Sequence, residues 1–249
     1  MSGILILTAV ELEARALARR LELPPITVLP FPAYGRGLLR VAPVGLRAGL
    51  LATRWPRLLA GFNYPLVVSG GVCGALALDL SAGDLVLPES VLGPSGERLN
   101  VTPTRHRQVT ELAGSARGGT LVTSPEVVAT AEAKAALFAS TGAMAVDMES
   151  SVILAHAGSA GCPTLVVRGV SDAAGESVPR ELIDLMTPAG RLRPMRALAL
   201  TVTNPRLVPR ALALSQGTRR APRVPAPPRR GPAACPDSGP TRAAPAADS

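Results

Sequence analysis

The feature that most constrains this fold is an alternation of short aliphatic runs and segments of helical periodicity between residues 1 and 216. The aliphatic runs are predicted strands and lie at 4–8, 38–42, 66–69, 84–88, 120–123, 143–147 and 164–170. The segments with apolar residues three and four apart are predicted helices and lie at 11–21, 47–59, 125–140, 151–160, 194–200 and 205–214. This order predicts one α/β domain with a largely parallel or mixed sheet and helices on its faces.

The last 33 residues have a different composition. Residues 217–249 contain six Arg and two Asp, so this segment carries a net charge of +4 within the chain's total of +8. It is rich in proline and lacks Leu, Ile and aromatic residues, so it has too little apolar surface to offset the entropy lost on ordering. We expect a catalytic domain over 1–216 and a disordered basic Pro/Arg-rich tail over 217–249.

Cysteine and histidine usage bounds the function classes. Cys73, Cys162 and Cys235 are scattered and odd in number, which favours neither a disulfide framework nor a zinc site. Two isolated histidines give no metal signature, so no metal is expected. The first apolar run lacks a basic lead-in, and no stretch approaches the roughly 18–20 apolar residues of a membrane span. These features predict a reduced, cytoplasmic protein.

Three acidic residues follow predicted strands, where α/β sheets bind their ligands. Glu13 falls on the apolar stripe of the first predicted helix, where it would cap the free amides or face a ligand cavity. Glu149 lies between Met148 and an aliphatic helix, and Asp147 or Ser150 are alternative caps for that helix. Asp172 ends an apolar strand and is either a general acid or a cap.

The other conspicuous residues have simpler interpretations. The glycine-rich run 69–74 permits close backbone approach to a ligand but matches neither a P-loop nor a dinucleotide fingerprint. Within it, Cys73 is predicted to be a small buried thiol rather than a nucleophile. His106 is expected in a solvated loop, and His156 is expected to pack in its helix. Lys134, the one lysine among 26 basic residues, is interpreted as a sign of coding bias.

Four segments together resemble the nucleoside phosphorylase and nucleosidase superfamily. They are Thr8 to Glu13, the run through Gly74 with 83–86 after it, 146–150, and 167–172. The chain resembles in particular the methylthioadenosine/S-adenosylhomocysteine nucleosidases and the hopanoid-associated phosphorylase-like proteins. This resemblance implies a three-layer α/β/α sandwich that cleaves the N-glycosidic bond of a nucleoside without a metal or other cofactor.

The resemblance also implies roles for individual residues. Glu149 would accept hydrogen bonds from the ribose 2′ and 3′ hydroxyls, with Met148 packing against the sugar. Asp172 would protonate N7 of a departing purine, with Ser171 positioning it. Glu13 would orient the attacking water. Protonation at N7 matters because the purine anion is a poor leaving group, and general acid catalysis is typically worth ~10²–10⁴-fold.

Three departures qualify the resemblance. The segment 124–128 has no aromatic residue to stack on the base, so Val128, Cys73 and Gly74 are expected to contact substrate through aliphatic and backbone groups. The glycine-rich run has no arginine for phosphate, which favours water as the acceptor, although Arg36, Arg40 and Arg47 leave a phosphate site open. Aspartate rather than asparagine at position 172 argues against close kinship with futalosine hydrolases.

The leading prediction is therefore hydrolysis of a 5′-substituted adenosine with release of adenine; the hopanoid resemblance adds adenosylhopane as a candidate substrate. A phosphate-dependent phosphorylase and a non-catalytic nucleoside-binding protein remain alternatives. The expected partners are a small-molecule nucleoside, water or phosphate, and a second copy in a homodimer. No specific nucleic acid is expected, and weak association of the basic tail with an anionic membrane stays open.

Overall fold

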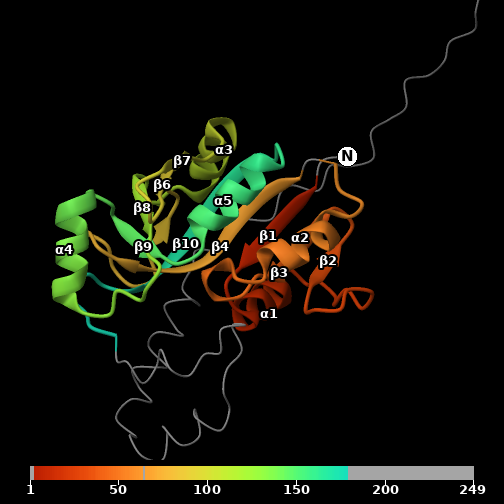
Figure 1. Ribbon diagram of the computed structural model, residues 1–249, viewed down its shortest axis with the longest axis horizontal. Helices are drawn as coiled ribbons and strands as arrows, with labels where there is room; N and C mark the ends of the chain where they lie inside the picture. Colours follow the sequence, from red (N-terminus) through yellow and green to blue (C-terminus); the bar gives the residue numbers. More distant parts are fainter. Residues whose placement is uncertain (1–2, 64, 179–249) are drawn as a thin grey trace, which may run out of the picture.

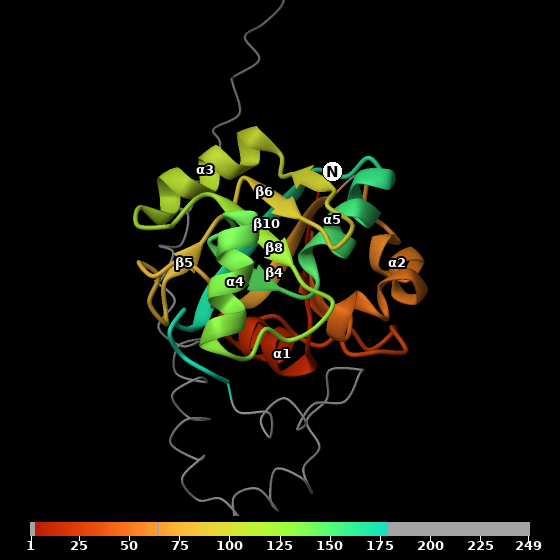
Figure 2. The same cartoon turned by 60° about the vertical axis from the view of Figure 1, so that its left-hand side comes forward.

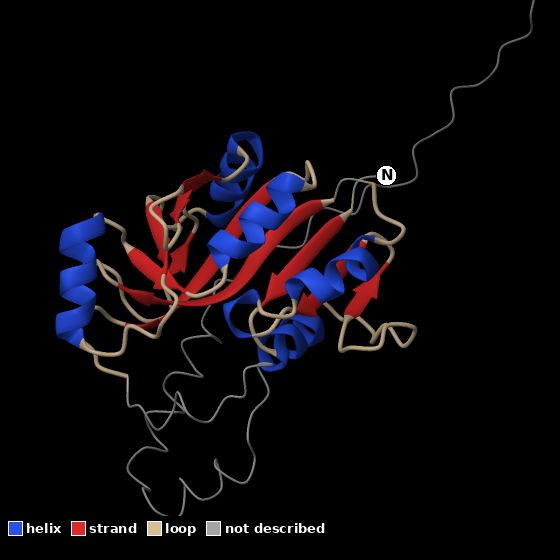
Figure 3. Ribbon diagram, viewed as in Figure 1, coloured by secondary structure: helices blue, strands red, loops and turns tan. Residues whose placement is uncertain are grey.

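The computed structural model describes residues 3–63 and 65–178, which form a mixed sheet flanked by helices (Figures 1 and 3). The strands are β1 Ile4–Thr8, β2 Tyr34–Arg36, β3 Leu39–Pro43, β4 Leu66–Ala75, β5 Leu85–Val86, β6 Ser90–Leu92, β7 Arg98–Asn100, β8 Thr120–Thr123, β9 Ala145–Asp147 and β10 Thr164–Asp172. The helices are α1 Glu11–Arg20, the 3-10 turn η1 Leu46–Ala48, α2 Leu51–Leu59, α3 Pro103–Ala113, α4 Ala131–Thr141 and α5 Ser150–Ser159.

The long strand β4 organises the sheet. It pairs in parallel with β1 and β10 and in antiparallel with β9, while β3 extends the sheet beyond β1. β8 and β6 continue it beyond β9, and β10 also pairs with the short strand β5. The carboxyl ends of β1, β4 and β10 therefore meet at one edge, which is where an α/β sheet binds ligands.

Alternating side chains on the strands build a core on each face of the sheet. In β8, Leu121 packs in the cluster that contains Leu154 of α5, whereas the next residue, Val122, packs in the cluster that contacts Leu137 of α4. This period of two places helices on opposite faces. In Figure 2, α4 lies in front of β8 while α5 lies to the right of the strands. The three-layer α/β/α expectation is thus confirmed.

Long periodic segments were predicted well, and short edge elements were not. β1 and β8 have the predicted bounds, and α1 differs from its prediction by one residue. The glycine-rich run, however, lies inside β4 rather than after it. The predicted helix 125–140 begins only at Ala131, and the predicted helix 47–59 divides into η1 and α2.

Three short strands and one helix were not predicted. They are β2, β6, β7 and α3. The prediction that His106 lies in a solvated loop is wrong, because His106 belongs to α3 and its Nε2 lies 2.8 Å from the Leu87 carbonyl oxygen. A polar helix with no fully buried residue gives only a weak apolar stripe in the sequence.

The predicted helices at 194–200 and 205–214, the boundary at 216 and the tail 217–249 lie outside the described residues. Within the part of the chain that the structure describes, no helix is both long enough and apolar enough to span a membrane.

Candidate active site

A cavity of about 300 Å³ opens at the strand ends, a size within the range of small-molecule sites. Its lining residues are Ala9, Val10, Glu13, Leu46, Val72, Cys73, Gly74, Glu126, Val127, Val128, Val146, Asp147, Met148, Glu149, Ser171, Asp172 and Val178. All eight residues assigned to the site from the sequence are in this set. The fold thus brings together groups that are up to 159 positions apart, from Glu13 to Asp172.

Glu13 caps the first helix and also lines the cavity, so the two positions predicted for it are compatible. Its Oε2 accepts a hydrogen bond from the Val10 amide at 3.2 Å, and its Oε1 accepts one from the Val72 amide at 3.1 Å. Burial raises the pKa of Glu13, against the lowering effects of the Arg168 charge and of these backbone amides. The carboxylate is thereby held at the junction of α1 and β4.

Glu149 lies at the start of α5 and is 4% exposed. Its Oε1 accepts a hydrogen bond from the Arg47 amide at 3.1 Å, and Arg47 adopts a left-handed conformation with φ of 55°. Burial raises the pKa of Glu149 to about 7; the charge of Arg168 opposes this rise, and that of Asp147 adds to it. A buried carboxylate with one backbone partner retains lone pairs for a ligand's hydroxyl groups.

Asp147 has a structural role, and capping of the helix was one of the two alternatives predicted from the sequence. Its Oδ2 accepts from the Ser150 amide at 3.1 Å and so caps α5, while its Oδ1 accepts from the Thr123 hydroxyl at 2.8 Å. Its Oδ2 also lies 2.6 Å from Nη2 of Arg168. The capping interpretation therefore applies to Asp147.

Arg168 is the buried cation of the site, and sequence reasoning missed it. It is 1% exposed in β10, and its Nη2 donates to Ser69 at 2.8 Å and to Ser150 at 3.0 Å. Its charge acts on Asp147, Glu149 and Glu13 together. An arginine inside an otherwise aliphatic strand was the available signal, because a charge at a buried strand position needs partners.

Asp172 ends β10 and is 6% exposed. The Ser171 hydroxyl donates to its Oδ1 and lies 3.0 Å from the Cys73 carbonyl oxygen. A register shift between Val170 and Asp172 makes this strand end irregular, and such bulges re-aim side chains near sites. The Oδ2 of Asp172 receives a hydrogen bond from Lys134, a second charged residue that the sequence reading did not place here.

Two glycines leave room for these acids. A Cβ atom at Gly71, whose φ is +152°, would lie 2.5 Å from Nη1 of Arg168 and 2.8 Å from Oε1 of Glu13. A Cβ atom at Gly74 would lie 3.2 Å from Oδ2 of Asp172. The glycine-rich run thus admits the protein's own charged side chains close to the strand backbone.

The remaining lining is largely apolar. Cys73 is 3% exposed, and burial raises the pKa of its thiol to about 12, so it is a neutral packing group at pH 7. Val127 and Val128 line the cavity together with Met148 and Val178. Among the described lining residues there is no Arg, Lys or His side chain; Arg36, Arg40 and Arg47 lie outside the set.

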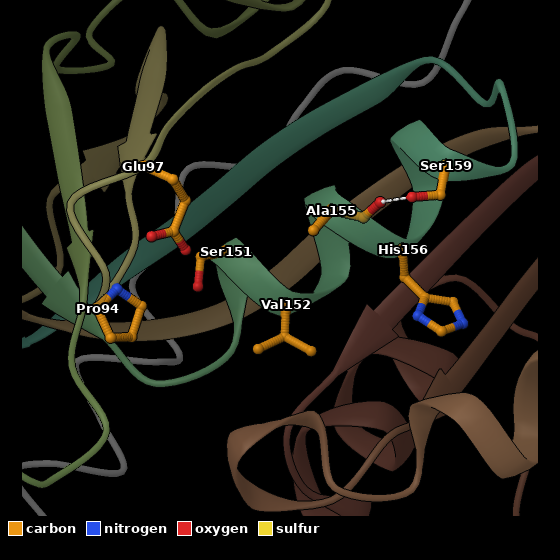
Figure 4. A pocket seen from close by; sticks show the side chains of 7 residues that line it. All are labelled: Pro94, Glu97, Ser151, Val152, Ala155, His156 and Ser159. Carbon is orange, nitrogen blue, oxygen red and sulfur yellow. Dashed lines mark hydrogen bonds between the residues drawn. The ribbon is translucent and has the colours of Figure 1, made fainter.

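A second cavity, of about 330 Å³, lies along the exposed side of α5 (Figure 4). Its lining residues are Pro94, Glu97, Ser151, Val152, Ala155, His156 and Ser159. Its single carboxylate is Glu97, and His156 packs edge-on against Trp55 with ring centroids 5.0 Å apart. The first cavity is therefore the candidate active site, because the three acids converge there.

The described residues contain no group of three or more His, Cys, Asp or Glu side chains arranged to hold a metal ion. The first cavity instead offers carboxylates from the ends of several strands, together with apolar walls. Such a set can orient a water molecule, accept hydrogen bonds from hydroxyl groups and exchange a proton with a bound base.

The chain is similar to known proteins in sequence and in fold. It is 32% identical over 226 residues to the futalosine hydrolase of Streptomyces coelicolor, covering 77% of this chain and 95% of that protein. A mutant of the Helicobacter pylori nucleosidase MTAN, with 5′-methylthioadenosine in its active site, is 17% identical with a TM-score of 0.64, covering 82% and 99% of the two chains. The Campylobacter jejuni 5′-methylthioadenosine/S-adenosylhomocysteine nucleosidase is 20% identical with a TM-score of 0.62, covering 72% and 89%.

The sequence match corrects one expectation. Aspartate at position 172 argues against close kinship with futalosine hydrolases, yet the 32% identity shows that the chain is related to one of them.

The model of the phosphorylase superfamily matches residues 4–201. This span includes β1 and every described element after it, with all the residues assigned to the site. The expectation of an enzyme of the nucleosidase and phosphorylase type is confirmed, and the chain belongs to the phosphorylase superfamily.

Proposed function

We propose that this protein is a purine nucleosidase that hydrolyses the N-glycosidic bond of a 5′-substituted adenosine and releases adenine. The observation that carries the proposal is the convergence of Glu13, Glu149 and Asp172 on one cavity. Each acid has a backbone, hydroxyl or ammonium partner that fixes its orientation. Positioned acids of this kind supply the orientation and proton transfer that the reaction requires.

In the proposed mechanism each acid acts on a different part of the substrate. Glu149 accepts hydrogen bonds from the ribose hydroxyls, and Met148 packs against the sugar. Asp172 gives a proton to N7 as the glycosidic bond breaks and the bonding electrons enter the purine ring. Glu13 orients a water molecule and takes its proton as the water attacks the cationic sugar carbon.

Water is the favoured acceptor because the described cavity lining holds no cationic side chain for phosphate. Arg40 is turned elsewhere: its Nη1 donates to the carbonyl oxygens of Leu58 and Ala60, at 2.8 and 2.7 Å. Arg47 is exposed and reaches the site through its amide alone. A phosphorylase would require a cation that moves into the site.

The test is release of adenine from methylthioadenosine, S-adenosylhomocysteine and adenosylhopane, with and without phosphate. We expect phosphate-independent release that Asp172→Asn and Glu13→Gln each reduce by about 10²–10⁴-fold. Glu97→Gln is the matched control, because Glu97 lines the second cavity. Release only with phosphate would make the protein a phosphorylase, and binding without release would make it a nucleoside-binding protein.

Hydrolysis of futalosine is a second candidate function, favoured by the 32% identity to the Streptomyces coelicolor enzyme of that name. Futalosine therefore belongs in the same assay. A kcat/KM for futalosine at least tenfold above that for each adenosine derivative would replace the adenosine proposal with this one.

Two finer proposals concern the environment of the enzyme. A homodimer is tested by the molar mass in solution, and a monomeric mass would contradict it. Weak binding of the basic tail to anionic membranes is tested by deleting residues 217–249: binding to anionic liposomes at low salt should fall while turnover is unchanged.

A further inference from the structure

Lys134 is a buried charge for which the proposed mechanism has no role. It is the one lysine in the chain, so the other 25 of the 26 basic residues are arginines. Its side chain is 0% exposed, although it belongs to α4 and lies outside the set that lines the cavity. A fully buried lysine is rare unless it is paired.

Three oxygens surround the ammonium group. Nζ donates to Oδ2 of Asp172, to the Ala173 carbonyl at 2.8 Å and to the Glu176 carbonyl at 2.7 Å. A lysine has three N–H groups, so each one has an acceptor. Converging acceptors suit a compact ammonium better than the planar guanidinium of arginine.

The same contacts hold Asp172 from both sides. Lys134 binds its Oδ2, and the Ser171 hydroxyl binds its Oδ1. Glu176 further stabilises the turn, because its Oε2 accepts from the Ala173 amide at 3.1 Å. The carboxyl group therefore cannot rotate without breaking a buried hydrogen bond.

We propose that Lys134 is the positioning residue of the general acid: it orients Asp172 and stabilises the negative charge that Asp172 carries after it protonates the leaving purine. This inference rests on the proposed function. Before the step, Asp172 takes up a proton from solvent beside the ammonium group. In the step, the O–H bond of Asp172 breaks and an N–H bond forms at N7. Asp172 becomes a carboxylate that faces the ammonium group and is reprotonated from solvent.

The charge balance makes this assignment specific. The other acids at the cavity are Glu13, Asp147 and Glu149, on which Arg168 acts, and the exposed Glu126. Within residues 3–63 and 65–178, Lys134 forms an ion pair with Asp172 and with no other acid. Its positive charge therefore acts mainly on Asp172, the acid that contacts the purine in the proposed mechanism.

A double-mutant cycle tests the proposal. Lys134→Met keeps most of the side-chain volume and removes the charge, and we expect kcat for adenine release to fall about 10²-fold with KM changed less than threefold. Because Lys134 acts through Asp172, the double variant Lys134→Met/Asp172→Asn should be no slower than Asp172→Asn alone. Arg117→Met, which breaks an exposed ion pair with Asp79, is the matched control and should leave kcat unchanged.

Two outcomes of the cycle would overturn the proposal. One is a Lys134→Met enzyme within threefold of the wild-type kcat, and the other is a double variant slower than Asp172→Asn by the full Lys134→Met factor. If wild type releases no base from any nucleoside, the proposed function fails first. Wild-type turnover with either overturning outcome rejects the role of Lys134 alone.

Ligand binding separates positioning of the acid from support of the cavity wall. Val178, which lines the cavity, donates its amide to the Ala129 carbonyl at 2.7 Å, so this wall leads into α4. A 7-deaza analogue of the substrate has no N7 to meet Asp172. We expect Lys134→Met to bind it with a Kd within threefold of wild type, whereas a purely structural role would weaken it at least tenfold.

A measurement on the wild-type chain keeps the proposal testable if Lys134→Met does not fold. With one lysine in the chain, ¹⁵N-lysine labelling of the untagged protein gives a single ammonium resonance. We expect slow hydrogen exchange at this group and a shift when methylthioadenosine analogues bind or when Asp172 becomes Asn. A resonance that exchanges like free lysine and ignores both changes would reject the pairing.

Discussion

The two sides of the cavity handle buried charge differently. On the arginine side, defined by Glu13, Asp147, Glu149 and Arg168, one cation acts on three acids. On the lysine side, defined by Ser171, Asp172 and Lys134, one cation pairs with one acid. Both cations are almost completely buried, so the difference lies in the number of acids rather than in exposure.

The arginine side therefore has carboxylates whose charge is only partly offset. The pKa of Glu13 is raised and that of Glu149 is raised to about 7, in each case chiefly by burial. Glu149 therefore changes charge near neutral pH, and both raised pKa values mark groups of the kind found at functional sites. The lysine side instead has a fixed pair, which suits a group that must present one oxygen to a base in one orientation.

The largest expected effect is on stability and comes from removing the shared cation. Arg168→Met leaves three acids without their cation, and breaking a buried pair typically costs roughly 3–5 kcal/mol. Lys134→Met leaves one acid unpaired and should cost less. Urea unfolding of both variants at pH 7.5 measures the two losses, and equal losses would contradict the comparison.

The next effect sharpens how closely the arginine side is packed. Gly71→Ala adds a Cβ atom against Arg168 and Glu13 at a backbone angle that disfavours side chains, and should lower the free energy of unfolding by about 3 kcal/mol. Gly169→Ala is the control, since no atom lies within 4 Å of its added Cβ. Thermal unfolding of both variants provides the measurement. Equal melting temperatures would show that the arginine side can accommodate the added methyl group.

A smaller effect, dependent on pH, comes from Glu149. Its raised pKa means that the folded state binds more protons than the unfolded chain between pH 4.5 and about 7, so its contribution to stability is lost as pH rises through that window. Glu149→Gln does not titrate and should exceed wild type in stability at pH 8 but not at pH 4. Unfolding curves at both pH values test this, and a difference independent of pH would refute it.

The kinetics of Glu149 follow from the same pKa. A carboxylate accepts ribose hydrogen bonds better than the protonated acid, so wild-type kcat/KM should rise with pH through about 7. The kcat/KM of Glu149→Gln should not rise with pH in this range and should be lower than that of wild type at every pH. If the kcat/KM of the variant still rises with pH at the same midpoint, the rise belongs to the titration of another group.

The smallest expected effect concerns Cys73, which we expect to pack against the cavity without carrying a charge. Cys73 lines the cavity, but its thiol has a pKa of about 12 and stays neutral. At pH 8, iodoacetamide should leave Cys73 unmodified, and Cys73→Ala should change kcat less than threefold. Mass spectrometry of the alkylated protein checks the first statement, and rapid modification of Cys73 would mean that the thiol is activated.

The sequence predicted the elements whose pattern is local. Ile4–Thr8 is a short aliphatic run and Glu11–Arg20 has a three- and four-residue apolar spacing, so both elements were placed to within one residue. An acid just after an apolar strand can be recognised in the sequence, and this pattern likewise identified Glu13, Glu149 and Asp172. The short strands β6 and β7 were missed because three residues carry too little periodicity.

The tertiary structure decided which charges meet. Arg168 and Lys134 are 34 positions apart and belong to a strand and a helix, and nothing local in either sequence names its partners. Lys134 shares a helix face with the partly buried Leu137, three residues on, which was the one local sign that its charge points inward. By itself the sequence determined an α/β domain with acids at its strand ends. The folded chain alone determined that one cation serves three acids and the other serves one, because ion pairing depends on distances in space that the strand order sets.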